Sequence, residues 1–173
     1  DPVDSTYFAA AAQFTLGEAH RRTAESITLP PGTVDIQRPF LDRRAEHVLA
    51  AQRAYFDTIR TRDPEWSAVA GHRIGGLYDA FFEMIVDAPA PPPPSQLTAQ
   101  NPDEYEREYR RALSLLAKPL LRHSIRYWEL ALMLIERNGV PTEWTDRIEA
   151  DLARVRARLA ALPEGEEGLG TGG

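Results

Sequence analysis

Apolar residues recur at steps of three and four along nearly the whole chain, which is the spacing of one face of an α-helix. Five segments show this pattern, each bounded by proline, glycine or capping residues. No run alternates apolar and polar residues as a half-buried strand does. The sequence therefore predicts an all-α protein of about five main helices.

The first two predicted helices cover residues 5–26 and 39–61. The apolar stripe of the first is Phe8, Ala12, Leu16, Ala19, Thr23 and Ile27. Residues 29–32 (Leu-Pro-Pro-Gly) end it, because proline cannot continue the hydrogen bonds of a helix and glycine suits a turn. The stripe of the second is Leu41, Ala45, Val48, Gln52, Tyr55 and Ile59. Stripes of this kind ordinarily face the core of a protein.

The third predicted helix runs to Val86 and opens on Asp63-Pro64-Glu65, an N-cap, a proline at the first helical position and an acid near the positive end of the helix dipole. Its stripe is Trp66, Ala70, Ile74, Leu77, Phe81 and Ile85, widened by Tyr78, Phe82 and Met84. We expect this helix to be the most central. Gly71 and Gly75 should let a neighbouring helix approach closely.

Trp66 is predicted to be structural. It opens the most apolar helix and should wedge against the preceding helix near Tyr55 or Phe56. The Trp66→Ala substitution is then expected to cost about 3 kcal/mol or more of stability.

The fourth predicted helix extends from residue 102 to 137, and Asn101-Pro102-Asp103-Glu104 repeats the start signal of the third. Its stripe is Tyr105, Tyr109, Ala112, Leu116, Leu120, His123, Tyr127, Leu130 and Leu134. Pro119 predicts a kink or a break inside it, and Asn138-Gly139 predicts its end. A last helix, capped by Thr142, has the stripe Trp144, Ile148, Leu152, Val155, Leu159 and Leu162.

These elements predict one domain over residues 1–162. Its parts are the first three helices (5–86), a proline-rich linker (87–101) and the last two helices (102–162). The linker favours extended polyproline II and acts as a semi-rigid spacer. A recognition motif for an SH3-like domain is the less favoured reading, since no basic residues flank it. The acidic, glycine-rich tail (163–173) has nothing to bury and is expected to be mobile.

Composition excludes several classes of function. The net charge is −6, with both signs spread along the chain, which makes nucleic acid a poor partner. The lack of cysteine excludes disulfides, thiolate metal sites and cysteine nucleophiles. The sequence contains no run of about 18 apolar residues, so membrane insertion of this segment is not predicted. The chain begins at Asp1, which we interpret as the start of a mature or excised piece.

No catalytic, cofactor-binding or metal-binding residue is predicted, because no Glu-x-x-His pair, nucleophile elbow or glycine-rich phosphate loop occurs. The four histidines lie singly on four predicted helices: His20, His47, His72 and His123. His123 falls on an apolar stripe and is expected to be a hydrogen-bonded core residue, whereas His47 and His72 are expected at the surface. A basic cluster is interleaved with glutamates and predicts a solvated face: Arg107, Arg110 and Arg111.

Several segments resemble divergent tetratricopeptide-type proteins of myxobacteria and related GC-rich bacteria. They are Leu16-Gly17, Trp66 with His72-Arg73-Ile74-Gly75 and Leu77-Tyr78, Ala88-Pro89, and Ala117-Lys118-Pro119-Leu120 with Tyr127. His20 departs from the repeat, which prefers an aromatic residue there. The resemblance implies an α-solenoid of stacked helix hairpins. It also implies the C-terminal portion of a large bacterial repeat protein associated with the cell envelope.

Two classes of function remain. The preferred one is a non-catalytic protein–protein interaction or scaffold module without a cofactor, part of a larger repeat protein. Its partner would be another protein or the remainder of its own chain, and the sequence does not predict an oligomeric state. The alternative is a ligand-binding or enzymatic bundle in which Tyr78, His123 and Tyr127 converge on a cavity. A polar-lined cavity above about 300 Å³ would favour the alternative. An exposed apolar strip on the order of several hundred Å² in area would favour the first.

Overall fold

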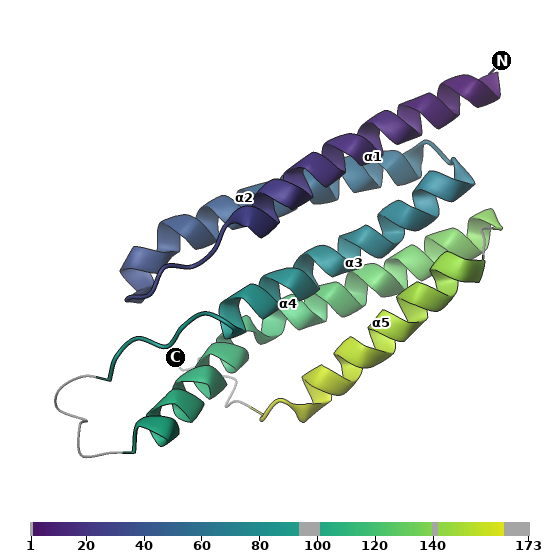
Figure 1. The fold of residues 1–173 in the computed structure, drawn as a ribbon. Coiled ribbons are helices and arrows are strands. Elements are labelled where there is room, and N and C mark those ends of the chain that lie inside the picture. Colours follow the sequence, from purple (N-terminus) through teal and green to yellow (C-terminus); the bar gives the residue numbers. More distant parts are fainter. Residues whose placement is uncertain (1, 94–100, 140–141, 165–173) are drawn as a thin grey trace, which may run out of the picture.

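The structure is a computed structural model that describes residues 2–93, 101–139 and 142–164. It contains five helices and, within the described residues, no strand (Figure 1). The helices are α1 Pro2–Ser26, α2 Val34–Arg60, α3 Pro64–Val86, α4 Pro102–Asn138 and α5 Thr142–Ala161. The predicted all-α fold of about five helices is confirmed. Residues 94–100 of the predicted linker and 165–173 of the predicted tail lie outside the described residues.

The helices run antiparallel to their neighbours along the chain and form two layers, with α1, α3 and α5 in one and α2 and α4 in the other (Figure 1). Helix α3 contacts all four other helices. It is therefore the centre of the fold, as its wide apolar surface predicted.

Two predicted starts are too late. Helix α1 begins at Pro2 rather than residue 5, and α2 begins at Val34 rather than about Pro39. Pro39 lies in the second turn of α2, where a proline removes only one helical hydrogen bond. Gln37 supports the early start, since its buried side-chain amide donates to the Pro30 carbonyl at 3.1 Å.

The predicted signals at the ends of α3 and α4 are confirmed. The Asp63 carboxylate accepts a hydrogen bond from the Trp66 amide at 3.0 Å, and the Asn101 side chain accepts one from the Asp103 amide at 3.1 Å. Gly139 ends α4 in the left-handed conformation, with φ of 68°. Helix α4 passes Pro119 without a break, and its N-terminal part runs at an angle to the rest (Figure 1).

The close approach predicted at Gly71 and Gly75 is confirmed, and the helix that approaches is α4. A Cβ atom on Gly75 would lie 2.4 Å from ring atoms of Trp128, and one on Gly71 would lie 3.0 Å from the Ala131 Cβ. The Trp128 indole donates to the His72 carbonyl at 2.9 Å. The α3–α4 contact therefore depends on glycine facing a buried indole.

The predicted buried stripe of α4 is wrong by about one position. Leu116 is 77% exposed and His123 is exposed. The buried residues are Ala117, Leu121, Ser124, Trp128, Ala131 and Ile135. On this face small or polar residues alternate with large ones, so the sequence pattern gave more weight to the neighbouring stripe of larger residues.

Candidate interaction surface

Four residues of the apolar stripe predicted for α1 face outward, whereas Ile27 at its end is buried as expected. Phe8 is 69% exposed and Leu16 is 50% exposed. Ala12, which lies between them, and Ala19, which follows Leu16, are also exposed. We call these four residues the α1 face. It carries no charge, whereas the exposed sides of soluble helices are ordinarily polar. The α1 face is therefore an unpartnered apolar surface.

The opposite side of α1 packs on α3 through aromatic rings. The Trp66 ring lies 5.7 Å from that of Tyr7 and 5.1 Å from that of Phe14. Trp66 was predicted to contact α2 near Tyr55 or Phe56, and this prediction is wrong. Its ring partners are on α1, because α1 and α3 are neighbours in one layer.

A half-buried carboxylate fixes this orientation of α1. The Glu18 side chain accepts hydrogen bonds from the Tyr55 hydroxyl at 2.6 Å, from Arg73 at 3.0 Å and from Arg21 at 2.7 Å. Burial by itself would raise the pKa of Glu18, but the hydrogen bonds from Arg21 and Tyr55 and the nearby charges outweigh it and lower the pKa to about 2. Turning α1 to bury its apolar stripe would expose this network, so the α1 face stays outward.

A buried arginine closes the end of the same hairpin. Arg44 of α2 donates to the carbonyls of Ala24 and Ile27 at the end of α1, at 3.0 and 3.3 Å, and its guanidinium lies over the Phe81 ring. Burial lowers the pKa of Arg44. Arg44 thus supplies a donor to two carbonyls at a helix end. The Ala24 carbonyl also accepts a hydrogen bond from the Ile27 amide at 3.2 Å. No sequence motif indicated either Glu18 or Arg44.

A second apolar surface is a groove of about 240 Å³ beside the α1–α2 connection. Its lining residues are Leu29, Val34, Gln37, Leu41, Ile85, Ala88, Leu113, Leu116, Ala117 and Leu120. Only Gln37 among them has a polar side chain, and that side chain is bonded to Pro30. The exposed Leu116 and Val34 lie at this groove because α4 extends beyond the other helices there (Figure 1).

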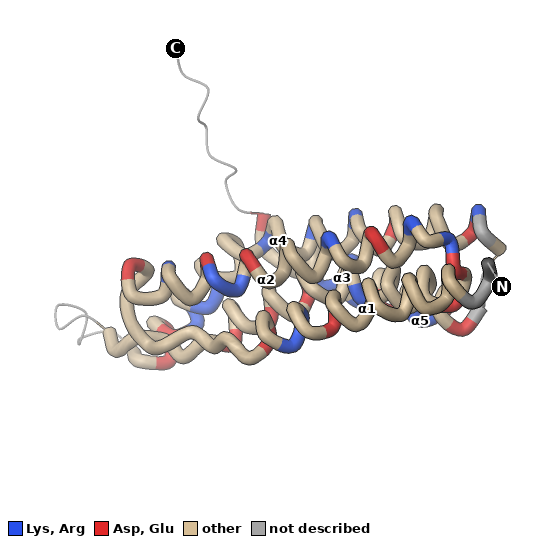
Figure 2. The backbone as a smooth tube through the Cα atoms, turned by 90° about the horizontal axis from the view of Figure 1, so that it is seen from above, with Lys and Arg blue, Asp and Glu red and all other residues tan. Residues whose placement is uncertain are grey.

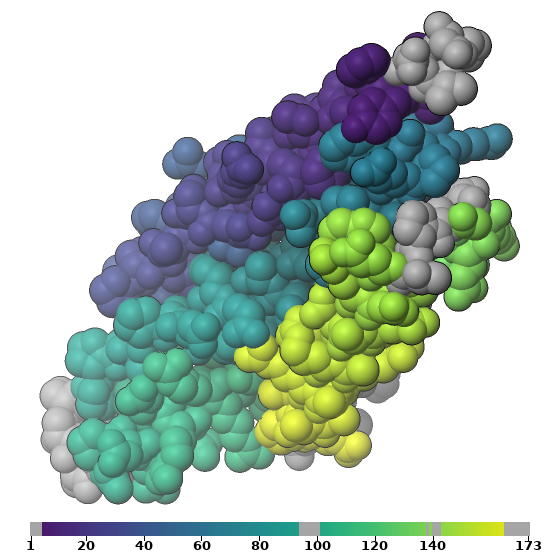
Figure 3. All heavy atoms as spheres, turned by 45° about the vertical axis from the view of Figure 1, so that its right-hand side comes forward, coloured from purple at the N-terminus to yellow at the C-terminus, as the bar shows by residue number. Residues whose placement is uncertain are grey.

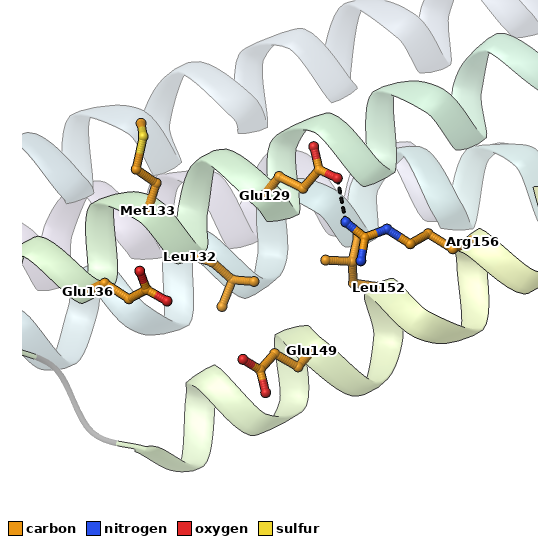
Figure 4. Close-up of a pocket in the computed structure, with 7 residues that line it drawn as sticks. All are labelled: Glu129, Leu132, Met133, Glu136, Glu149, Leu152 and Arg156. Atoms are coloured by element: carbon orange, nitrogen blue, oxygen red, sulfur yellow. Dashed lines mark hydrogen bonds and ion pairs between the residues drawn. The ribbon is translucent and has the colours of Figure 1, made fainter.

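A groove between α4 and α5 is larger and more polar, with a volume of about 450 Å³ (Figure 4). Leu132 and Leu152 contribute to its lining, and three glutamates and Arg156 border it. Arg156 pairs with Glu129 at 2.5 Å, and the carboxylates of Glu136 and Glu149 extend from facing helices (Figure 4). The described residues contain no group of three or more side chains suited to hold a metal ion.

The rings predicted to converge in the alternative reading do meet. The Tyr78 ring lies 5.2 Å from the Tyr127 ring and 5.4 Å from the His123 ring. Burial raises the pKa of Tyr78, and its hydroxyl donates to the Gln52 side chain. The rings contact one another directly, and His123 is exposed rather than in the core as predicted.

The other histidines form contacts that the sequence did not indicate. The Nδ1 atoms of His20 and His47 lie 3.3 Å apart, between α1 and α2. His72 is half-buried rather than at the surface, and its Nε2 lies 2.7 Å from an Asp151 carboxylate oxygen. This pair and the Asp79–Arg154 pair at 2.7 Å join α3 to α5.

Charges of both signs mingle along the backbone (Figure 2). The predicted basic cluster lies among acids as expected, with Arg110 bonded to Glu106 at 3.0 Å and Arg111 3.9 Å from Glu108. None of the helices, over the described residues, has the length and apolarity needed to cross a membrane. No protein-family profile, curated protein sequence or solved structure matches this chain.

Proposed function

We propose that this chain is a non-catalytic protein–protein interaction or scaffold module, and that it forms part of a larger helical-repeat protein. The observation that carries the proposal is the α1 face, an exposed strip without charge. Helix α1 lies along one edge of the molecule (Figure 3). Exposed apolar surface of this kind marks an interaction site in soluble proteins. The tetratricopeptide-like reading is supported by the layered, antiparallel packing and by the segments that resemble that repeat.

The alternative, a small-ligand or enzymatic bundle, has weaker support. Tyr78, His123 and Tyr127 meet, but they stack on one another and His123 faces solvent. The α4–α5 groove exceeds the expected volume and has polar sides. It lies away from those three residues, however, and one of its carboxylates is already paired with Arg156.

Site-specific photo-cross-linking tests the proposal. Leu16 on the α1 face and Leu49 on α2 are the same residue type with matched exposure, 50% and 51%. A photoreactive residue at position 16, in the protein as its own cell makes it, should give a defined cross-link to protein, and one at position 49 should not. No product at position 16, or the same products at both positions, would contradict an interaction through the α1 face.

A further inference from the structure

The three helices of the first layer carry their apolar stripes in the same register. Steps of four, four, three and four residues separate the stripe positions in each helix. The positions are Phe8, Ala12, Leu16, Ala19 and Thr23 in α1, Trp66, Ala70, Ile74, Leu77 and Phe81 in α3, and Trp144, Ile148, Leu152, Val155 and Leu159 in α5. Each stripe opens on an aromatic residue, so the three helices can be compared position by position.

In α3 and α5 this stripe packs on the preceding hairpin. Trp66 contacts Phe14 of α1, and the α3 stripe shares a buried cluster with residues of α2 that include Val48 and Tyr55. Trp144 contacts His72 of α3 at 5.7 Å, and the α5 stripe shares a buried cluster with residues of α4 that include Trp128. Phe14 and His72 are themselves equivalent positions, so the two contacts follow one plan.

A second set of contacts supports the equivalence. Gly17 of α1 lies beneath Tyr55 of α2, where a Cβ atom would be 2.6 Å from the ring. Gly75 of α3 lies beneath Trp128 of α4 in the same way, and the two glycines occupy the same register position relative to their stripes. Helices α1 and α3 thus each present a glycine to the helix that follows, and α3 and α5 each present an apolar stripe to the hairpin that precedes them.

Only the α1 stripe lacks a hairpin within the described part of the chain. Helix α5 lies at the opposite edge of the layer (Figure 3) and differs from α1 in the chemistry of its exposed residues. Its exposed positions include charged residues such as Asp146, Glu149 and Arg156 together with alanines. The α5 edge is therefore suited to water, and the α1 edge is suited to burial.

We propose that the α1 face receives one more antiparallel helix hairpin of the α1/α2 kind, from the N-terminal side of the same polypeptide. Both buried stripes are covered by the hairpin that directly precedes them in the chain, which favours this source over a separate molecule. The inference rests on the proposed function and names its partner.

The residues of the α1 face define what the hairpin must offer. Phe8 occupies the position of Trp66 and calls for aromatic neighbours. Thr15 occupies the position of Arg73, which pairs with Glu18 of the preceding hairpin. Because threonine carries no charge, the added hairpin needs no acid equivalent to Glu18. Ala19 and Thr23 are smaller than Leu77 and Phe81 at the same register, and the hairpin must supply bulkier side chains there.

An extended protein tests this inference with a hairpin whose sequence is known. Residues 2–63 are placed directly before residue 6 of the chain, which repeats the α1/α2 hairpin and keeps the register of the α2–α3 connection. We expect one cooperative urea transition with a higher midpoint and a steeper slope than the original chain, because more surface is buried. Adding Ala19→Leu and Thr23→Phe to the second α1 should raise the midpoint again.

The Leu16→Glu substitution, numbered as in the original chain and made in its α1, is the decisive variant. It should leave the midpoint of the original chain unchanged and lower that of the extended protein. Leu49→Glu is the matched control and should leave both midpoints unchanged. The inference would be overturned if the added hairpin unfolded independently in the extended protein both without and with Ala19→Leu and Thr23→Phe. It would also be overturned if Leu16→Glu left the midpoint of the extended protein unchanged.

Two results would overturn the inference while leaving the proposed function in place. One is a dimer of the original chain in sedimentation equilibrium that Leu16→Glu dissociates, which would make a second copy the occupant. The other is a position-16 cross-link to a separate protein rather than to an earlier part of the same polypeptide. Absence of any cross-link at position 16 would instead contradict the proposed function itself.

Discussion

Replacing Gly75 by alanine should destabilise the protein, although alanine is the better helix former. The substitution gains about 1 kcal/mol of helix propensity. Its Cβ would lie 2.4 Å from ring atoms of Trp128, far inside the contact distance of about 3.5–4.0 Å between carbon atoms. Trp128 cannot yield easily, since it is 1% exposed and its indole donates to the His72 carbonyl. Ser124 also bonds the Gly75 carbonyl at 2.8 Å.

Overpacking of a core costs about 1–3 kcal/mol, occasionally more. The added Cβ would lie too close to three ring atoms of Trp128, and two hydrogen bonds hold the α3–α4 contact in place. We therefore expect a cost at the upper end of that range, which the gain in helix propensity reduces to a net loss of about 2 kcal/mol. The matched control is the adjacent Gly76, where a Cβ would meet nothing within 4 Å. Gly76→Ala should gain up to about 1 kcal/mol. Urea unfolding followed by circular dichroism measures both, and a Gly75→Ala protein as stable as Gly76→Ala would refute the reasoning.

Three further substitutions test other contacts. Trp66→Ala should cost about 2–3 kcal/mol in urea unfolding through loss of the ring contacts with α1, with the partly exposed edge of the indole limiting the effect. Glu18→Gln should cost roughly 1–3 kcal/mol at neutral pH. Because the pKa of Glu18 is lowered from 4.5 to about 2, the stability it adds is complete above pH 4.5 and is lost as the pH falls toward 2. The Glu18→Gln protein should therefore lose less stability than the parent over that pH range in acid titrations of thermal unfolding. Arg44→Met should cost about 1–3 kcal/mol, since it removes the guanidinium donor from the Ile27 carbonyl and leaves the Ala24 carbonyl with only the Ile27 amide, and an unchanged melting temperature would contradict that role.

The sequence predicted the helices well where the signals are local. Asp63-Pro64 and Asn101-Pro102 start helices because a capping side chain and a proline act within one turn. Gly139 ends α4 because it alone tolerates the left-handed conformation there without strain. Pro39 was misleading because its effect depends on how much helix precedes it, which Gln37 and its bond to Pro30 decide.

The sequence predicted less well which side of each helix is buried. In α4, Ala117 and Ser124 are buried beside larger residues, and a scale of apolarity does not favour them. In α1, Glu18 is half-buried and Leu16 exposed because Tyr55 and Arg73, distant in sequence, form the partners of the carboxylate. Periodicity identifies an apolar stripe, but it cannot say whether this chain or another segment covers it.

The most direct test of an interaction through the α1 face uses the fact that the chain has no cysteine. Ala12→Cys places a single thiol on the α1 face, and Ala153→Cys places one on the exposed side of α5. In the isolated 173-residue chain, both thiols should react rapidly with a maleimide. In the protein as its own cell makes it, we expect the thiol at position 12 to be protected and the thiol at position 153 to react as before. Equal reactivity of the two thiols there would show that the α1 face remains in water and would contradict the account.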